Sequence, residues 1–266
     1  MTRIAAAVIV VIGLAAGAPS FAGRAPEGTR ALEQDFIGGR REPLPESGTN
    51  QPYDGRLTFV RLRYTMGFYG RRGGEPPWAH DYPTADTHVM KILNELTLAR
   101  PRMDGSNVLS LADPELHKYP VAYMSEPGFW SMDEDEVKGL RAYLSKGGFI
   151  MFDDFRGQDF DNLQDQMRLV FPLGQWVELD ASHPIFHSFF EIDDPHTMTP
   201  PYGGMPPMFY AMFENNDRNG RVMAMANVNN DLGEYWEYSD TGYAPVDLSN
   251  EAYKFGVNYF IYAMTH

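Results

Sequence analysis

The chain has 266 residues, a net charge of −14 at pH 7 and no cysteine. The absence of cysteine excludes disulfide bonds, a thiolate nucleophile and thiolate metal ligands. The acidic surface that this charge predicts repels phosphate backbones and anionic lipid headgroups, which argues against nucleic acid as a partner.

The first 22 residues have the pattern of a secretory signal peptide. Arg3 precedes an apolar run from Ile4 to Ala16, and small residues follow up to Ala22. The run is shorter than the roughly 20 residues that a membrane-spanning helix needs. We therefore expect cleavage after Ala22, a periplasmic or secreted protein, and no transmembrane segment in the mature chain. An anchor that stays uncleaved is the alternative.

Residues 23–56 contain glycine, proline, arginine and glutamate without an apolar period, which predicts an extended arm. The remaining residues, 57–266, are enough for one large domain with its own core. The domain opens with LTFVRLRY (57–64), where apolar and arginine residues alternate, and this alternation predicts a half-buried strand.

A long connection follows this strand, and Thr84 is expected to cap the next helix, which carries an apolar stripe. Short strands are then predicted at NVLSL and PVAYM. Ser131 and Glu134 suggest a capping box for a helix that Gly147 ends. The apolar run GFIMF (148–152) predicts a buried strand, followed by a helix through Leu163.

The second half of the domain adds a hairpin and a closing helix. PMFYAMFENNDRNGRVMAMANV (207–228) predicts two antiparallel strands, with Asn219 and Gly220 supplying the positive φ angles of the turn. Residues 250–266 are apolar on most sides and predict a buried helix. Strands that alternate with helices favour an α/β fold with a mostly parallel sheet and a C-terminal hairpin addition.

Four motifs together carry a resemblance to a known family: WAHDYPTADTHVMKILNELT, YLSKGGFIMFDDFRG, NVNNDLGEYWE and FGVNYFIYAMTH. Over about residues 57–266 they resemble the bacterial domain of unknown function four-one-five-nine. The resemblance implies a class I glutamine amidotransferase-like fold, a flavodoxin-like three-layer α/β/α sandwich. The trehalose-utilisation proteins share that fold, and SHPIF at 182–186 is similar to their His-Pro-Ile segment.

The resemblance supplies a fold and no established activity. In amidotransferase-like folds a cysteine nucleophile follows the strand that corresponds to GFIMF, and here Asp153 and Asp154 stand in its place. This difference excludes the amidotransferase reaction. Members of the family often lie in larger membrane-associated proteins with von Willebrand A-like regions, which implies an assembly role and a protein partner in the cell envelope.

Candidate ligand-binding residues lie where predicted strands end, because ligands of open parallel sheets bind at the carboxyl ends of the strands. Asp153 and Asp154 follow GFIMF, Tyr64 ends the first strand, and Glu126 follows PVAYMS. An aspartate there can bind a hydroxyl, hold a cation or act as an acid or base. The structural alternative is that one aspartate caps a loop or helix while the other pairs with an arginine.

Two further segments contribute candidates. The long connection after the first strand contains Trp78, His80 and Asp81, and the alternative role for Trp78 is to fill the core. In NVNNDLGEYWE the residues Asn230, Asp231 and Glu234 could bind a sugar or peptide, or could satisfy the backbone of a turn instead.

The favoured interpretation is an exported, non-catalytic module that binds a small polar ligand or an envelope protein. The alternative is a hydrolase that acts on a carbohydrate-like or amide substrate through Asp153 or Asp154 with His80. A metal-binding protein is the third interpretation, and it ranks last because the sequence shows no complete ligand set. No metal or other cofactor is therefore expected.

Overall fold

The structure is a computed structural model that describes residues 50–66 and 76–266. The expected signal peptide and residues 23–49 of the expected arm lie outside the described residues. At the described end of the arm, the Asn50 side chain donates to the Val108 carbonyl oxygen and accepts from the Val108 amide, both at 2.8 Å. Asn50 therefore packs beside the edge strand of the sheet.

A seven-stranded sheet forms the centre of the domain, in the order β3-β1-β4-β6-β9-β8-β7. Neighbouring strands are parallel from β3 to β9, and β8 is antiparallel to both β9 and β7. The strands are β1 (Val60–Leu62), β3 (Asn107–Leu109), β4 (Val121–Ser125), β6 (Phe149–Phe155), β7 (Trp176–Glu178), β8 (Met208–Phe213) and β9 (Val222–Val228). Two short strands, β2 (Thr65–Met66) and β5 (Trp130–Ser131), pair separately.

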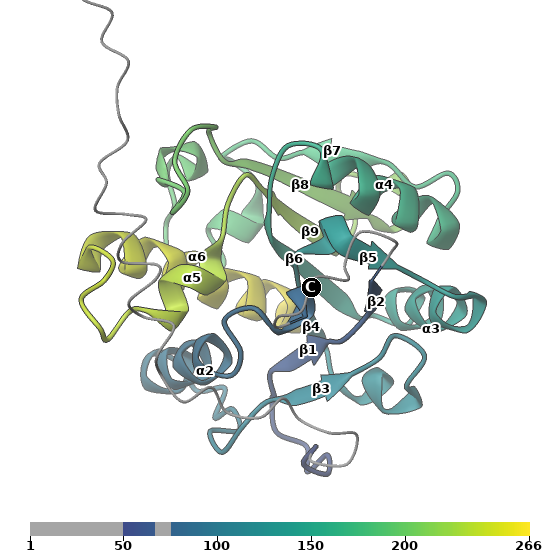
Figure 1. The fold of residues 1–266 in the computed structure, drawn as a ribbon, viewed down its shortest axis with the longest axis horizontal. Helices are drawn as coiled ribbons and strands as arrows, with labels where there is room; N and C mark the ends of the chain where they lie inside the picture. The colour runs from purple at the N-terminus through teal and green to yellow at the C-terminus, as the bar shows by residue number, and fades with distance from the viewer. Residues whose placement is uncertain (1–49, 67–75) are drawn as a thin grey trace, which may run out of the picture. The chain divides into compact units, whose positions relative to one another are not determined.

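Helices cover both faces of the sheet (Figure 1). The helices α2, α5 and α6 share one hydrophobic core with the sheet, and α3 and α4 share the other. This arrangement and the β8–β9 hairpin confirm the predicted α/β fold with a mostly parallel sheet. The helices are α2 (Thr84–Leu96), α3 (Glu134–Ser145), α4 (Asp159–Val170), α5 (Leu232–Glu237) and α6 (Val246–Thr265).

The prediction of a half-buried first strand is wrong, because β1 is buried on both faces. Arg61 has no exposed surface and forms an ion pair with Asp86 of α2, with 2.5 Å between Nη2 and Oδ1. Its guanidinium also lies 4.8 Å from the centre of the Tyr123 ring. A strand inside a parallel sheet has helices on both sides, so a charged side chain in it needs a buried partner.

Three local predictions differ from the structure in detail. The capping box of α3 is formed by Asp133 and Glu136 rather than by Ser131 and Glu134, so the helix begins later. Thr84 is the first residue of α2 rather than its cap, since Pro83 takes the N-cap position and provides no side-chain hydrogen bond. In the β8–β9 connection the positive φ angles belong to Asn215 and Asn216, not to Asn219 and Gly220. The sequence therefore predicts the elements better than the residues that begin or turn them.

Within the described ranges, no helix combines the length and the apolar content that crossing a membrane requires.

Candidate functional site

The last residues of the strand β6 before Phe155 are two buried aspartates, which break the alternation of the strand. Asp153 has no exposed surface and Asp154 is 6% exposed. The pairing of β6 with β9 shifts register between Phe152 and Phe155, and Asp154 has a φ of +56°. A bulge of this kind turns a side chain away from the direction that regular alternation would give it. The two carboxylates consequently meet different partners.

Asp153 is fully engaged in the fold. Its carboxylate accepts hydrogen bonds from the Tyr123 hydroxyl (3.1 Å), the Asn227 amide (3.0 Å) and the backbone amides of Leu232 (2.8 Å) and Gly233 (3.0 Å). The last two amides belong to the first turn of α5, where backbone N–H groups have no partner within the helix. Asp153 therefore ties α5 to the central strand.

Arg61 holds the backbone of His80 in place. The guanidinium Nη1 of Arg61 donates to the carbonyl oxygens of Trp78 (3.2 Å) and His80 (2.7 Å). These bonds fix the backbone of the connection between β1 and α2, and so they hold His80 in place although it lies outside the regular helices and strands of the sheet. The His80 ring is left 41% exposed at the carboxyl end of the sheet.

Asp154 contacts this histidine and a tyrosine from a distant loop. Its Oδ2 lies 2.6 Å from Nδ1 of His80 and 3.2 Å from the Ser125 hydroxyl. Its Oδ1 accepts from the Tyr202 hydroxyl, which also contacts Oδ2 of Asp231. A single tyrosine proton cannot serve both carboxylates, so Asp154, Tyr202 and Asp231 share protons.

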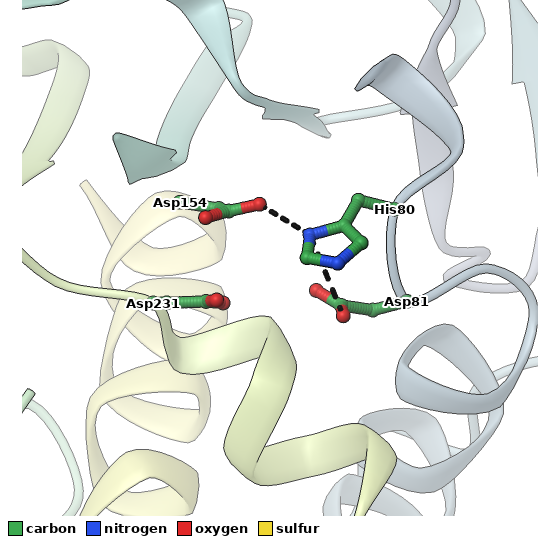
Figure 2. Close-up of side chains that lie close together, drawn as sticks. All are labelled: His80, Asp81, Asp154 and Asp231. Atoms are coloured by element: carbon green, nitrogen blue, oxygen red, sulfur yellow. Dashed lines mark hydrogen bonds and ion pairs between the residues drawn. The ribbon is translucent and has the colours of Figure 1, made fainter. Parts of the chain in front are cut away.

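Asp231 and Asp81 complete a cluster with these residues. Asp231 caps α5 by accepting from the Glu234 amide (2.8 Å), while its other oxygen faces Tyr202. Asp81 is 3% exposed, and neither of its carboxylate oxygens has a hydrogen-bond partner among the residues that the structure describes. Figure 2 shows the side chains of His80, Asp81, Asp154 and Asp231 pointing toward one another. We call these four residues the rim cluster.

Burial and mutual repulsion dominate the electrostatics of the rim cluster. Burial raises the pKa values of Asp81 and Asp231 well above their usual range, and the charge of Asp154 raises both further. Burial acts most strongly on the pKa of Asp154 and raises it, but the hydrogen bond to His80, the charge of His80 and the bond to Tyr202 together lower the pKa below its usual value. Burial acts to lower the pKa of His80, but the charge of Asp81 and the bond to Asp154 raise it to about 12.

Two neighbouring carboxyl groups have raised pKa values as well. Burial raises the pKa of Asp153 to about 6, against the opposing effect of the hydrogen bonds that it accepts. Burial and the charge of Asp154 raise the pKa of Glu126 to about 7. Carboxyl groups are thus packed together with less positive charge than they need to ionise fully.

Four residues at the carboxyl end of the sheet, in and around the rim cluster, have a left-handed backbone conformation that residues other than glycine seldom adopt. These residues are Asp81 (φ +63°), Glu126 (+46°), Asp154 (+56°) and Asn229 (+59°), and all lie at the carboxyl ends of the strands or in the connections that follow them. Such conformations cost of order 1–3 kcal/mol each and concentrate at binding sites and active sites. The rim therefore has a second property of a functional site.

A cavity of about 250 Å³ opens beside the rim cluster and is lined by His80, Glu126, Asp154, Arg156 and Tyr202, among others. A larger cavity of about 580 Å³ lies between β7, the β8–β9 connection and the end of α6. We place the candidate site at the smaller cavity, because it lies at the carboxyl ends of the parallel strands and contains the clustered groups.

The predicted residues fall into three groups. His80, Asp81, Asp154 and Asp231 come together, and Glu126 lies beside them, with its Oε1 3.6 Å from Nδ1 of His80. Tyr64 supports the rim by donating to the carbonyl oxygens of Ser125 and Glu126. The other candidates do not join this cluster. Asp153 is bonded within the fold, Trp78 lies in the core beside α3 and α4, Asn230 is buried against Met198, and Glu234 lies on α5 near Asp81.

Tyr202 and Ser125 are the site residues that the sequence did not single out. Tyr202 lies in the proline- and glycine-rich segment TPPYGGMPP, which gives no sign that its hydroxyl reaches Asp154 and Asp231. The guanidinium of Arg156 stacks 4.5 Å from the centre of the Tyr202 ring. Ser125 ends β4, the strand beside β6, so strand pairing was the one available signal.

The fold and site define an α/β protein with an acidic cluster at the carboxyl ends of its parallel strands. A comparison with protein families matches residues 58–264 to "Domain of unknown function (DUF4159)". The chain belongs to this family. A comparison with curated proteins gives no match.

Proposed function

We propose that this protein is an exported, non-catalytic binding module that holds a small polar, positively charged ligand at the rim cluster. One observation carries the proposal: the carboxylates of Asp81, Asp154 and Asp231 face one histidine beside an open cavity. Clustered carboxylates repel one another, and a cationic ligand would remove that repulsion. The ligand would supply the positive charge that the site lacks, and this attraction would provide the affinity.

The partners of Asp153 favour binding over catalysis. It stands where amidotransferase-like proteins carry their nucleophile, yet four donors occupy its carboxylate and it has no exposed surface. A nucleophile needs a free lone pair and access to substrate. Asp153 is therefore a structural residue in this proposal.

The contact between His80 and Asp154 supports a second candidate, the hydrolase. A histidine oriented by a carboxylate at 2.6 Å beside a cavity is an arrangement that general acid–base catalysis uses. In this alternative His80 would transfer protons and Asp154 would orient it. We rank it second because Ser125, whose hydroxyl donates to Asp154 at 3.2 Å, has no exposed surface from which it could attack a substrate.

Strand order supports the flavodoxin-like, amidotransferase-related fold as part of this proposal. Numbered among themselves, the five parallel strands β1, β3, β4, β6 and β9 follow the order 2-1-3-4-5. This is the order of flavodoxin-like sheets, which bind ligands where the direction of winding reverses. The reversal lies between β1 and β4, next to His80 and Glu126. Export rests on residues 1–22 alone, and a protein partner in the envelope remains an inference from the family resemblance.

The proposal can be tested by measuring the melting temperature of the full chain with MnCl₂, putrescine or glucosamine. We expect at least one of the three to raise the melting temperature of the wild type and not that of Asp154→Asn, because a ligand of the folded state stabilises it. Hydrolysis of p-nitrophenyl esters and glycosides is measured on the same samples. No stabilisation by any of the three, or turnover abolished by both His80→Ala and Asp154→Asn, would contradict the proposal.

A further inference from the structure

The rim cluster has the composition and spacing of a metal site. One atom from each of His80, Asp81, Asp154 and Asp231 lies within 4.8 Å of the other three. Two ligands on opposite sides of a first-row metal ion are separated by about 4.0–4.4 Å, given bonds of about 2.0–2.2 Å. The four atoms therefore lie close to the separations of ligands that share one ion.

Asp81 is an independent indication that something is missing from the cluster. A carboxylate that is 3% exposed and accepts no hydrogen bond from the described residues is costly to bury. Its nearest positive group is Nδ1 of His80, 3.8 Å from Oδ1 and beyond hydrogen-bonding distance. Figure 2 shows its carboxylate directed at the space between His80 and Asp231. A bound cation there would satisfy it.

The remaining contacts show how the cluster is held together when protons occupy it. His80 Nδ1 and the Tyr202 hydroxyl bring protons to Asp154, and Tyr202 also contacts Asp231. These protons lie between the same oxygen and nitrogen atoms that a metal ion would join. Binding an ion would release the proton of His80 Nδ1, since a ligating imidazole nitrogen has to be deprotonated.

We propose that Nδ1 of His80 and the carboxylates of Asp81, Asp154 and Asp231 bind one divalent first-row transition-metal cation. This inference rests on the proposed function, because it names the ligand of the same site. The imidazole favours Zn²⁺ over Mg²⁺ and Ca²⁺, which prefer all-oxygen sites, and the three carboxylates suit Mn²⁺. Three carboxylates and a neutral histidine would leave a net charge of −1 around the ion.

Equilibrium dialysis of the chelator-treated full chain against MnCl₂ or ZnCl₂ tests this proposal, with bound metal measured by elemental analysis. We expect the wild type to bind, and Asp154→Asn and Asp231→Asn to bind at least about tenfold more weakly. Asn tolerates the positive φ of Asp154, so this variant keeps its backbone. Asp161→Asn is the matched control, since it removes one exposed carboxylate from α4 outside the cavity.

Circular dichroism establishes that each variant is folded before its affinity is compared. A wild type that binds neither ion, or an Asp154→Asn and an Asp231→Asn variant that both bind like the control, would overturn the metal site. Stabilisation by putrescine or glucosamine under those conditions would leave the binding module standing and remove only the metal. If none of these ligands binds, both proposals fail together.

Discussion

Asp153 and Asp154 are consecutive residues of β6, yet their carboxylates serve different parts of the molecule. Asp153 accepts from two backbone amides of α5 and joins that helix to the sheet. Asp154, with its φ of +56°, turns to His80 and the cavity. The positive φ angle of Asp154 thus turns its carboxylate toward the site, while the carboxylate of Asp153 stays in a structural role.

This division predicts unequal costs for the same substitution. Asp153→Asn replaces an oxygen acceptor with an NH₂ group facing buried donors, so we expect it to lower the free energy of unfolding by about 2–4 kcal/mol. Asp154→Asn should cost less, about 1 kcal/mol, because the amide still accepts from Ser125, although the attraction between the carboxylate and His80 is lost. Urea denaturation of both variants measures the difference. Equal losses would show that the two residues have the same role.

Gly233 of α5 leaves room for Asp81. A Cβ atom at this position would lie 2.3 Å from Oδ2 of Asp81 and 2.8 Å from the Tyr123 hydroxyl. Glycine to alanine in a helix ordinarily stabilises by about 0.5–1 kcal/mol, but we expect Gly233→Ala to destabilise by about 1–3 kcal/mol. In an Asp81→Gly background the cost should shrink, which a double-mutant cycle measures. Additive effects would indicate that the two positions do not interact.

Much of the fold could be predicted, because its signals are local. The apolar run of β6 and the residues of α6, which are apolar on most sides, predict a buried strand and a buried helix. The burial of Arg61 could not be predicted, since alternation alone does not reveal that helices cover both faces of β1. Helix starts were also missed, because several residues near each start can cap and packing selects among them.

The four residues of the rim cluster could each be named as candidates from the sequence, but their meeting in one cluster could not be predicted. Strand-end position identified Asp154, and the connection after β1 suggested His80 and Asp81. No spacing rule joins them to Asp231, which comes close because β6 and β9 are neighbours, or to Tyr202, which reaches both aspartates from the loop before β8. A metal-ligand set drawn from three separate segments leaves no motif, and for this reason the sequence showed none.

The two histidines of the SHPIFH segment should have pKa values on opposite sides of the ordinary histidine value of 6.5. Burial lowers the pKa of His183, whose Nδ1 accepts from the Ile185 amide. The bonds of His187 to the Ala181 carbonyl and to Glu191 raise its pKa. The stability that His187 contributes is therefore fully present below pH 6.5 and is lost as the pH rises through its folded pKa. The stability that neutral His183 contributes is present above pH 6.5 and is lost as the pH falls below that value. Titration by NMR checks both, and a common value near 6.5 would contradict them.

Export predicts a mature protein that begins at Gly23. Signal peptidases cleave after small residues such as Ala22, with another small residue, Ser20, two positions before it. N-terminal sequencing of protein from the envelope fraction should therefore read from Gly23, and Ala22→Leu should slow the cleavage. Protein with an intact N-terminal extension, confined to the cytosol, would refute export.

Asp81 is buried in the rim cluster to bind a cation and does not support the fold, and thermal denaturation of Asp81→Asn with and without MnCl₂ tests this most directly. Burial disfavours the charged form of Asp81, so without the ion the variant should be at least as stable as the wild type. At a concentration one hundred times its Kd, the ion should stabilise the wild type by about 2.7 kcal/mol and the variant far less. A variant that is several kcal/mol less stable without the ion, or that gains as much from MnCl₂ as the wild type, would contradict the account.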